Sequence, residues 1–262
     1  MSNTPTTENT IDTLSRQLLL AFLIRVFRTL HPAGPRLAMN WRIKAMCRLL
    51  ERVDAGEFLR LIMEVPPRHL KSIATSVAFT AWLLGRNPGL KIIVASYSSE
   101  LAEKHARDFR MIVNSAWYKA LFPRTVIRSD TANEIVTAAG GGRRAVSLGG
   151  TVTGLGADII IIDDLMKAAD SSSDAETRRV HDFYTQTLLS RLNSQVAGKI
   201  IVIQQRLANM ISWAGSKNMP ILKSTAFPPL PRRMNALISD TARRTTGNVV
   251  RFYSPHFCRW RS

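Results

Sequence analysis

The sequence predicts an α/β fold in which helices flank a mostly parallel central sheet and a helical segment precedes that sheet. Short apolar or β-branched runs alternate with helical segments over most of the chain, which is typical of parallel sheets covered on both faces. The run from Asp158 to Asp164 contains four consecutive isoleucines and ends in two carboxylates, as expected of a buried strand. The pair Lys71 and Ser72 directly follows another predicted strand and precedes a predicted helix.

Composition excludes several classes of protein. At 262 residues and 45% hydrophobic residues, the chain is long enough for one large domain with extensions. Its apolar runs are shorter than the roughly 20 residues that cross a bilayer, so we expect no membrane partner. Cys47 and Cys258 are its two cysteines, which argues against a disulfide framework or a zinc site. We expect a cytoplasmic protein.

The N-terminal part is predicted to be helical. Residues 1–14 are expected to form a polar tail, and residues 15–57 a helical lead-in. Helical periodicity runs over Ile11–Leu30 and ends in the turn residues 31–35. A second helix is predicted from about Trp41 to Val53.

Residues 58–207 are predicted to form the α/β core. Five short runs bounded by turn-forming or charged residues are predicted strands: Leu59–Val65, Lys91–Ala95, Arg144–Leu148, Asp158–Ile162 and Lys199–Ile203. Three segments between them are predicted helices: Ser72–Leu84, Ser98–Val113 and Asp174–Leu192. Ser98 is a candidate N-cap of the second of these helices.

The stretch Val65–Ser72 is placed where a phosphate-binding loop belongs, between a strand and a helix. Such a loop directs backbone N–H groups and a helix N-terminus at phosphates, while a lysine reaches the β- and γ-phosphate oxygens and a hydroxyl binds Mg²⁺. Lys71 and Ser72 supply the lysine and the hydroxyl. The standard pattern has glycine where this chain has Val65 and Leu70, so the stretch alone is a weak signal.

Asp163 and Asp164 supply the second half of such a site. They lie at the carboxyl end of a predicted buried strand, the edge at which ligands bind in parallel sheets. In P-loop NTPases the first acid holds Mg²⁺ and a second acid polarises the attacking water. An Asp-rich turn after a buried strand is the alternative reading, but the combination with Lys71 and Ser72 favours a P-loop NTPase.

Two further motifs leave alternatives open. The glycine-rich stretch 149–156 leads into a strand, with no Lys-Ser pair and helix after it, so we interpret it as a flexible connection. Gln205 follows the last predicted strand at the same sheet edge. It is either a sensor of the γ-phosphate or the ordinary polar start of a loop.

Together these motifs resemble the ATPase domain of the large terminase subunit of tailed bacteriophages and prophages. The resemblance covers about residues 15–207 in the family's order. It rests on eight segments: 66–72 (Pro-Pro-Arg-His-Leu-Lys-Ser), 96–108, 117–118, 121–123, 149–154, 159–164, 188–192 and 205–207.

The resemblance implies an ATP-driven motor that packages double-stranded DNA into procapsids in the bacterial host cytoplasm. ATP and Mg²⁺ are the implied cofactors. The implied partners, besides DNA, are the portal protein and the small terminase subunit, with a homo-oligomeric ring as the assembly.

The resemblance also implies roles for individual residues. Pro67, Arg68, His69, Leu70, Lys71, Ser72 and Gln205 are the implied nucleotide-binding residues. Ser72 and Asp163 would hold the metal, and Asp164 would be the catalytic carboxylate. Arg68 and Lys71 would stabilise the charge that develops on the γ-phosphoryl group. Many relatives have Glu where this chain has Asp164, and the shorter acid makes the general-base role less secure than the metal role of Asp163.

The resemblance stops after Leu207, where the family continues toward an Asp-Leu-x-Gly motif. Met210 requires the codon ATG and Trp213 the codon TGG, and reading two bases further on yields Asp and Gly at the spacing of that motif. Residues 208–262 carry nine basic side chains against one acid, Asp240. We therefore interpret them as a frameshifted tail, with a genuine basic DNA-binding tail as the rival reading. Either way we expect no nuclease domain and no nuclease activity.

Two other functions compete with the truncated terminase ATPase. A helicase-like DNA-dependent ATPase would share the lysine loop and the paired carboxylates. A non-enzymatic basic DNA-binding protein would agree with the net charge of +17. Because the domain is cut at its last predicted strand, whether it still hydrolyses ATP is uncertain on sequence grounds.

Overall fold

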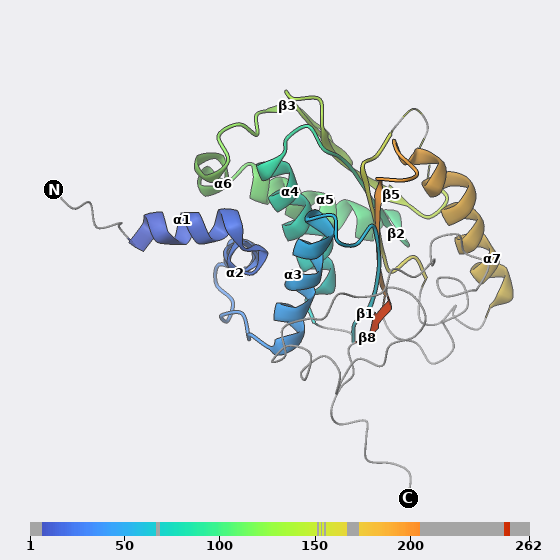
Figure 1. Cartoon of the computed structure of the whole chain (residues 1–262), viewed down its shortest axis with the longest axis horizontal. Helices are drawn as coiled ribbons and strands as arrows, with labels where there is room; N and C mark the ends of the chain where they lie inside the picture. Colours follow the sequence, from blue (N-terminus) through green and yellow to red (C-terminus); the bar gives the residue numbers. More distant parts are fainter. Residues whose placement is uncertain are drawn as a thin grey trace, which may run out of the picture.

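A computed structural model of the chain is built around one eight-stranded sheet, in the order β3-β4-β5-β2-β6-β7-β1-β8 (Figure 1). It describes residues 7–66, 69–150, 152, 154, 156–166, 173–204 and 249–251. The strands are β1 Arg60–Glu64, β2 Lys91–Ser96, β3 Ile127–Asp130, β4 Glu134–Thr137, β5 Gly142–Ser147, β6 Ile159–Asp163, β7 Lys199–Gln204 and β8 Val249–Arg251.

Most of the sheet is parallel, as predicted. The five predicted strands are β1, β2, β5, β6 and β7, and every pair among the neighbours from β5 to β8 is parallel. The predicted α/β class is therefore confirmed. The short strands β3 and β4 pair antiparallel at one edge and were not predicted. Strand β3 is largely exposed and β4 alternates half-buried with buried residues, so neither has the continuous buried run that marks the central strands.

The described helices are α1 Thr7–Gln17, α2 Leu19–Leu30, α3 Trp41–Asp54, α4 Thr80–Arg86, α5 Ser99–Val113, α6 Ala116–Leu121 and α7 Asp174–Asp182. Two π-helical segments, Ile73–Phe79 and Phe183–Leu188, and a short 3₁₀ segment, Leu189–Arg191, extend this set. The hydroxyl of Ser98 accepts a 3.3 Å hydrogen bond from the backbone N–H of Leu101, which confirms the predicted cap of α5. Within the described ranges, no helix has both the length and the apolarity that crossing a bilayer requires.

The four isoleucines of β6 show how the sheet divides the core. Successive strand side chains point to opposite faces. Ile159 and Ile161 pack with residues of α2, α3, α4 and α5, whereas Ile160 and Ile162 pack with the α7 side. Figure 1 shows α7 on the opposite side of the sheet from α2 to α5. Because helices cover both faces of the sheet at β6, every side chain of this strand is buried, which explains its four consecutive isoleucines.

The helical lead-in is part of the same core. Phe22 of α2 is fully buried, and the apolar residues of α2 and α3 belong to one cluster with those of β1, β2, β6 and β7. The carboxylate of Glu51 in α3 accepts a 2.9 Å hydrogen bond from the backbone N–H of Leu19, the first residue of α2. Helix α1 begins at Thr7, within the segment expected to be a polar tail, and the extended residue Leu18 separates it from α2.

Part of the predicted tail joins the sheet. Strand β8 pairs parallel with β1, with Ile62 opposite Val249 and Glu64 opposite Arg251. The other residues of 208–262 lie outside the described residues. For them the frameshift interpretation stays a prediction.

Candidate functional site

Polar side chains gather where the central parallel strands end. Glu64, Ser96, Asp163 and Gln204 are the last residues of β1, β2, β6 and β7, and all four are buried. The strand register places Ser96 beside Asp163 and Glu64 beside Gln204. The Gln204 amide also donates a 3.3 Å hydrogen bond to the Glu64 carboxylate. Buried polar groups are concentrated at the carboxyl edge, where ligands bind in such sheets.

The loop after β1 enters its helix through an unusual backbone conformation at Leu70. Leu70 has φ of 57°, in the left-handed region that favours glycine. This is one of the positions at which the standard phosphate-loop pattern has glycine, so the leucine takes up the conformation that the pattern requires. Strain of this kind is concentrated at functional sites. Directly after Leu70, Lys71 and Ser72 begin the helical segment.

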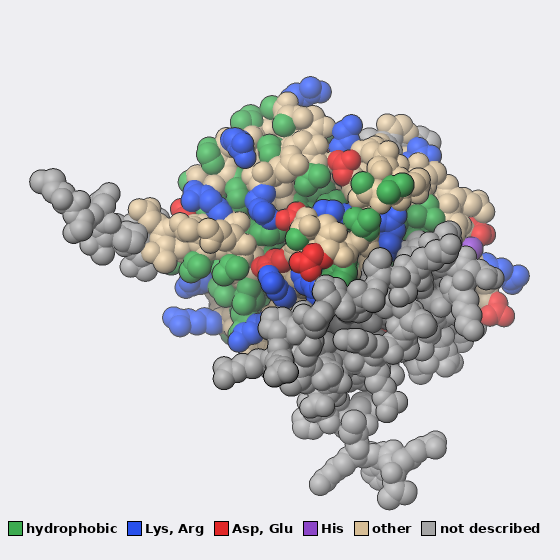
Figure 2. Space-filling model, viewed as in Figure 1, with side chains coloured by type: hydrophobic (Ala, Val, Ile, Leu, Met, Phe, Trp, Pro, Cys, Tyr) green, Lys and Arg blue, Asp and Glu red, His purple; other side chains and the backbone are tan. Residues whose placement is uncertain are grey.

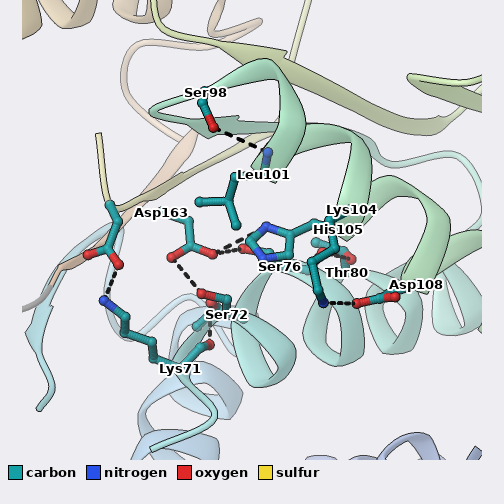
Figure 3. Close-up of polar contacts among 12 residues, drawn as sticks. Lys71, Ser72, Ser76, Thr80, Ser98, Leu101, Lys104, His105, Asp108 and Asp163 are labelled. Carbon is teal, nitrogen blue, oxygen red and sulfur yellow. Dashed lines mark hydrogen bonds and ion pairs between the residues drawn. The ribbon is translucent and has the colours of Figure 1, made fainter. Parts of the chain in front are cut away.

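Lys71 and Asp164 form an ion pair across the site, and Figure 3 labels Lys71 together with Ser72 and Asp163. The Lys71 ammonium donates to Asp164 Oδ2, although the two residues are 93 positions apart in the sequence. Asp164 reaches the lysine because its backbone leaves β6 with φ of 47°, a conformation that aspartate tolerates better than most residues. The Lys71 side chain is 10% exposed and that of Asp164 is 26% exposed. The two predicted halves of the site are thus adjacent in space.

Asp163 lies behind this ion pair and is fully buried. Its Oδ1 accepts a 3.1 Å hydrogen bond from the Ser72 hydroxyl, and its Oδ2 accepts a 2.6 Å hydrogen bond from the Ser76 hydroxyl. Burial raises the pKa of Asp163. The hydrogen bonds from both serines and the charges of Lys71 and Arg143 act in the opposite direction.

The oxygens of Ser72 and Asp163 suit a magnesium ion. Two neighbouring ligands at about 2.1 Å from Mg²⁺ lie about 3.0 Å apart in an octahedron, and the Ser72 Oγ to Asp163 Oδ1 distance is 3.1 Å. In the described part of the chain, no group of three or more His, Cys, Asp and Glu side chains forms a metal cage. Mg²⁺ commonly uses one or two protein ligands together with substrate phosphates, so this sparse oxygen set fits that ion.

His105 of α5 approaches the same carboxylate from another side. Its Nδ1 lies 3.7 Å from Asp163 Oδ2, and its side chain is 4% exposed. Burial, together with the nearby cations Arg143 and Lys104, lowers the pKa of His105 to about 4. The imidazole is therefore neutral at pH 7, and its approach to Asp163 is not an ion pair there.

This lowered pKa predicts a loss of stability in acid. The imidazole titrates near pH 6.5 in the unfolded chain but near pH 4 in the folded one, so the unfolded state binds more protons between these values. The contribution of His105 is complete above about pH 6.5 and is lost as the pH falls to 4, about 3 kcal/mol in total. Urea unfolding of the natural chain and His105→Gln at a series of pH values measures the difference. Parallel stability curves from pH 7 to 4 would contradict the prediction.

Arg143 of β5 completes the buried polar group. It is 2% exposed, lies with its guanidinium carbon 5.0 Å from the centre of the Phe109 ring, and donates a 3.2 Å hydrogen bond from Nε to the backbone carbonyl of Ser76. Burial lowers its pKa to about 9, so it remains a cation at pH 7. The positive charge lies close enough to Asp163 to favour the ionised carboxylate.

The structure brings together most of the predicted site residues that it describes. Lys71, Ser72, Asp163 and Asp164 form one cluster (Figure 3). His69 and Leu70 lie in the loop before it, and His69 Nε2 is 3.4 Å from Arg42 Nη1. Pro67, Arg68 and Gln205 lie outside the described residues, so their predicted roles stay predictions.

Three residues of the cluster were not predicted: Ser76, His105 and Arg143. A local signal exists only for Ser76, which lies four residues after Ser72 in an otherwise mostly apolar helical segment. His105 stands at helical spacing between Leu101 and Phe109, which predicts a place on the apolar face of its helix. The sequence gives no sign that Arg143 is buried, because it stands beside a second arginine in a polar, glycine-rich stretch.

The glycine-rich stretch 149–156 lies apart from the loop that carries Lys71. It connects β5 to β6, which are both neighbours of β2, so this connection passes over β2. Val152 and Ala157 pack into the cluster on the α7 side. As interpreted from the sequence, the stretch is a connection, and it differs in position from the loop that carries Lys71.

Surface charge does not by itself locate a partner. Figure 2 shows Lys and Arg side chains in several separate groups over the described part of one face, with fewer Asp and Glu side chains between them. A protein of net charge +17 attracts polyanions in general. The site described above is therefore the better guide to function.

The chain resembles a solved structure but matches no known family by sequence. No protein-family model matches the sequence, and no curated protein matches it either. Among solved structures, the chain is similar to the HK97 bacteriophage large terminase, with 17% sequence identity and a TM-score of 0.49. The match covers 75% of this chain and 40% of that one, so this chain spans less than half of that terminase.

Proposed function

We propose that this chain is the ATPase motor domain of a phage large terminase, which hydrolyses ATP with Mg²⁺ to drive double-stranded DNA packaging. The observation that carries the proposal is the double contact between the start of the helix after β1 and the end of β6. Lys71 pairs with Asp164, and Ser72 with Asp163, at the carboxyl edge of a parallel sheet. This combination of a lysine, a hydroxyl and two carboxylates is what phosphoryl transfer requires.

The residues can act in a definite order. The Lys71 ammonium leaves Asp164 when a phosphate group arrives, because the phosphate offers it more negative charge than one carboxylate does. Asp164 is then free to accept a proton from a water molecule. That water attacks the γ-phosphorus, and ADP leaves with the electron pair of the broken P–O bond. Ser72 and Asp163 would hold Mg²⁺, which when bound neutralises charge on the phosphate oxygens.

The partners follow from the same proposal. Double-stranded DNA would be the transported polyanion, and the portal protein and the small terminase subunit would hold a ring of these chains at the procapsid. The helicase-like alternative uses the same site geometry. Strand separation of a DNA duplex on ATP addition would favour that alternative over a packaging motor.

Phosphate release from ATP tests the proposal directly. The purified chain is expected to hydrolyse ATP with Mg²⁺ and to stop when EDTA removes the metal. Asp164→Asn is expected to lower turnover at least about 100-fold, because the proton acceptor is lost. The same variant should bind ATP at least as tightly as the natural chain, since Lys71 no longer pairs with a charged carboxylate.

The matched control is Asp182→Asn, which alters an exposed carboxylate at the end of α7. It should leave both turnover and ATP binding unchanged. A folded natural chain that neither binds nor hydrolyses ATP would overturn the proposal. Such a result would agree instead with a decayed gene product.

A further inference from the structure

Ser76 is a buried hydroxyl in the second turn of the helical segment that begins at Lys71. Its side chain has no solvent exposure. The segment Ile73–Phe79 is π-helical, a rare conformation that occurs mostly at functional sites. A buried hydroxyl is costly unless it forms a hydrogen bond, so the partner of Ser76 explains its presence.

That partner is Asp163. The Ser76 Oγ to Asp163 Oδ2 distance of 2.6 Å lies within the range of charge-assisted hydrogen bonds from hydroxyl to carboxylate, about 2.5–2.7 Å. Ser72 donates to the other oxygen, Oδ1, at 3.1 Å. The two serines thus divide the carboxylate between them (Figure 3). Ser72 lies directly after the phosphate loop, whereas Ser76 lies one turn further along the helix and is fully buried.

Hydrogen bonds also fix the backbone of Ser76. Its backbone carbonyl accepts hydrogen bonds from Arg143 Nε at 3.2 Å and from the Thr80 hydroxyl at 3.0 Å. Arg143 in turn lies over the Phe109 ring. The serine therefore connects the carboxylate to two elements, β5 and α5, that contribute no residue to the phosphate loop.

We propose that Ser76 is a positioning residue for the metal carboxylate. It holds Oδ2 of Asp163 so that Oδ1 stays beside the Ser72 hydroxyl, and these two oxygens together receive a divalent cation. The inference rests on the proposed function, because it needs a metal site at Ser72 and Asp163. It assigns a role to a residue that does not itself contact nucleotide or metal.

Metal affinity is the measurement that tests this role. Mn²⁺ is titrated into each variant and followed by the electron paramagnetic resonance signal of free Mn²⁺. A non-hydrolysable ATP analogue is present below the protein concentration, so that the nucleotide is protein-bound. Ser76→Ala is expected to weaken Mn²⁺ binding about 10-fold or more, as loss of residues that orient metal ligands does. Binding of the analogue in EDTA should not change.

Two further variants separate positioning from general loosening of the helix. Ser76→Thr keeps the hydroxyl and should restore Mn²⁺ affinity toward that of the natural chain. Tyr118→Phe removes another buried hydroxyl that bonds this helical run, through the backbone carbonyl of Ala81, and that hydrogen bond does not involve Ser76. It should leave Mn²⁺ affinity unchanged.

The outcomes distinguish the inference from the function on which it rests. If the natural chain binds the analogue and Mn²⁺ and Ser76→Ala binds Mn²⁺ equally well, the positioning role is wrong and the proposed function stands. An equal loss in Tyr118→Phe would also overturn the role, since the effect would then belong to the packing of the helix. If the natural chain binds neither ligand, the proposed function fails, and the inference fails with it.

Discussion

Replacing Lys71 with alanine is expected to lower ATP turnover at least about 100-fold, comparable to removing one preorganised donor from an active site. The Lys71 ammonium is the cation at the start of the helix after β1, and Asp164 holds it at the place where the two halves of the site meet. Under the proposed function, the negative charge that develops on the γ-phosphoryl group would lose this cationic partner. Phosphate release at saturating ATP and Mg²⁺ measures the loss.

Stability should change little in Lys71→Ala. Asp164 is partly exposed, so water can solvate the carboxylate that remains, and such pairs contribute about 0–1 kcal/mol. Lys104→Ala is the matched control, because it also removes a lysine paired with an aspartate, Asp108, on α5. Turnover in Lys71→Ala equal to that of the control would show that Lys71 does not bind the phosphates.

Phe22→Ala is expected to lower the free energy of unfolding by about 3–5 kcal/mol, the usual cost of truncating a buried phenylalanine. Phe22 is fully buried in α2. Its ring centre lies 5.5 Å from that of Trp117, 6.2 Å from that of Tyr118 and 6.0 Å from that of Phe122. The substitution would leave a cavity between the helical lead-in and α6.

Urea denaturation checks this value, with Ile24→Ala as the control. Ile24 lies on the same helix but is 37% exposed, so its truncation should cost less than about 1 kcal/mol. A loss below 1 kcal/mol in Phe22→Ala would mean that the lead-in does not share a core with the sheet.

The predictable part of the fold is the part with a strong local pattern. Four consecutive isoleucines between acids indicate a strand buried on both faces, and β6 is such a strand. The hairpin of β3 and β4 has no such pattern, because its strands lie at an exposed edge and are stabilised by pairing with β5. The π-helical turns cannot be read from a helical period either. They depend on contacts with residues far away in the sequence.

In the site, too, only the residues that belong to short local motifs could be predicted from the sequence. Lys71, Ser72, Asp163 and Asp164 belong to short motifs whose order and chemistry are visible in the sequence. The contact between Ser76 and Arg143 joins residues 67 positions apart, and no local pattern links the two. The left-handed backbone of Leu70 could not be predicted either, because leucine rarely adopts a φ of 57°.

Strand order also fixes when the site can form during synthesis. The first described partner of β1 in the sheet is β7, and paired residues such as Arg60 and Ile200 are 140 positions apart. Ribosomes add about 5–20 residues per second, so β1 waits roughly 7–28 s for that partner. The half-sheet of β2, β5 and β6 is complete earlier, since β6 ends at Asp163. The strand that leads into the phosphate loop is thus made early but pairs late, after the strand that carries Asp163 has been synthesised.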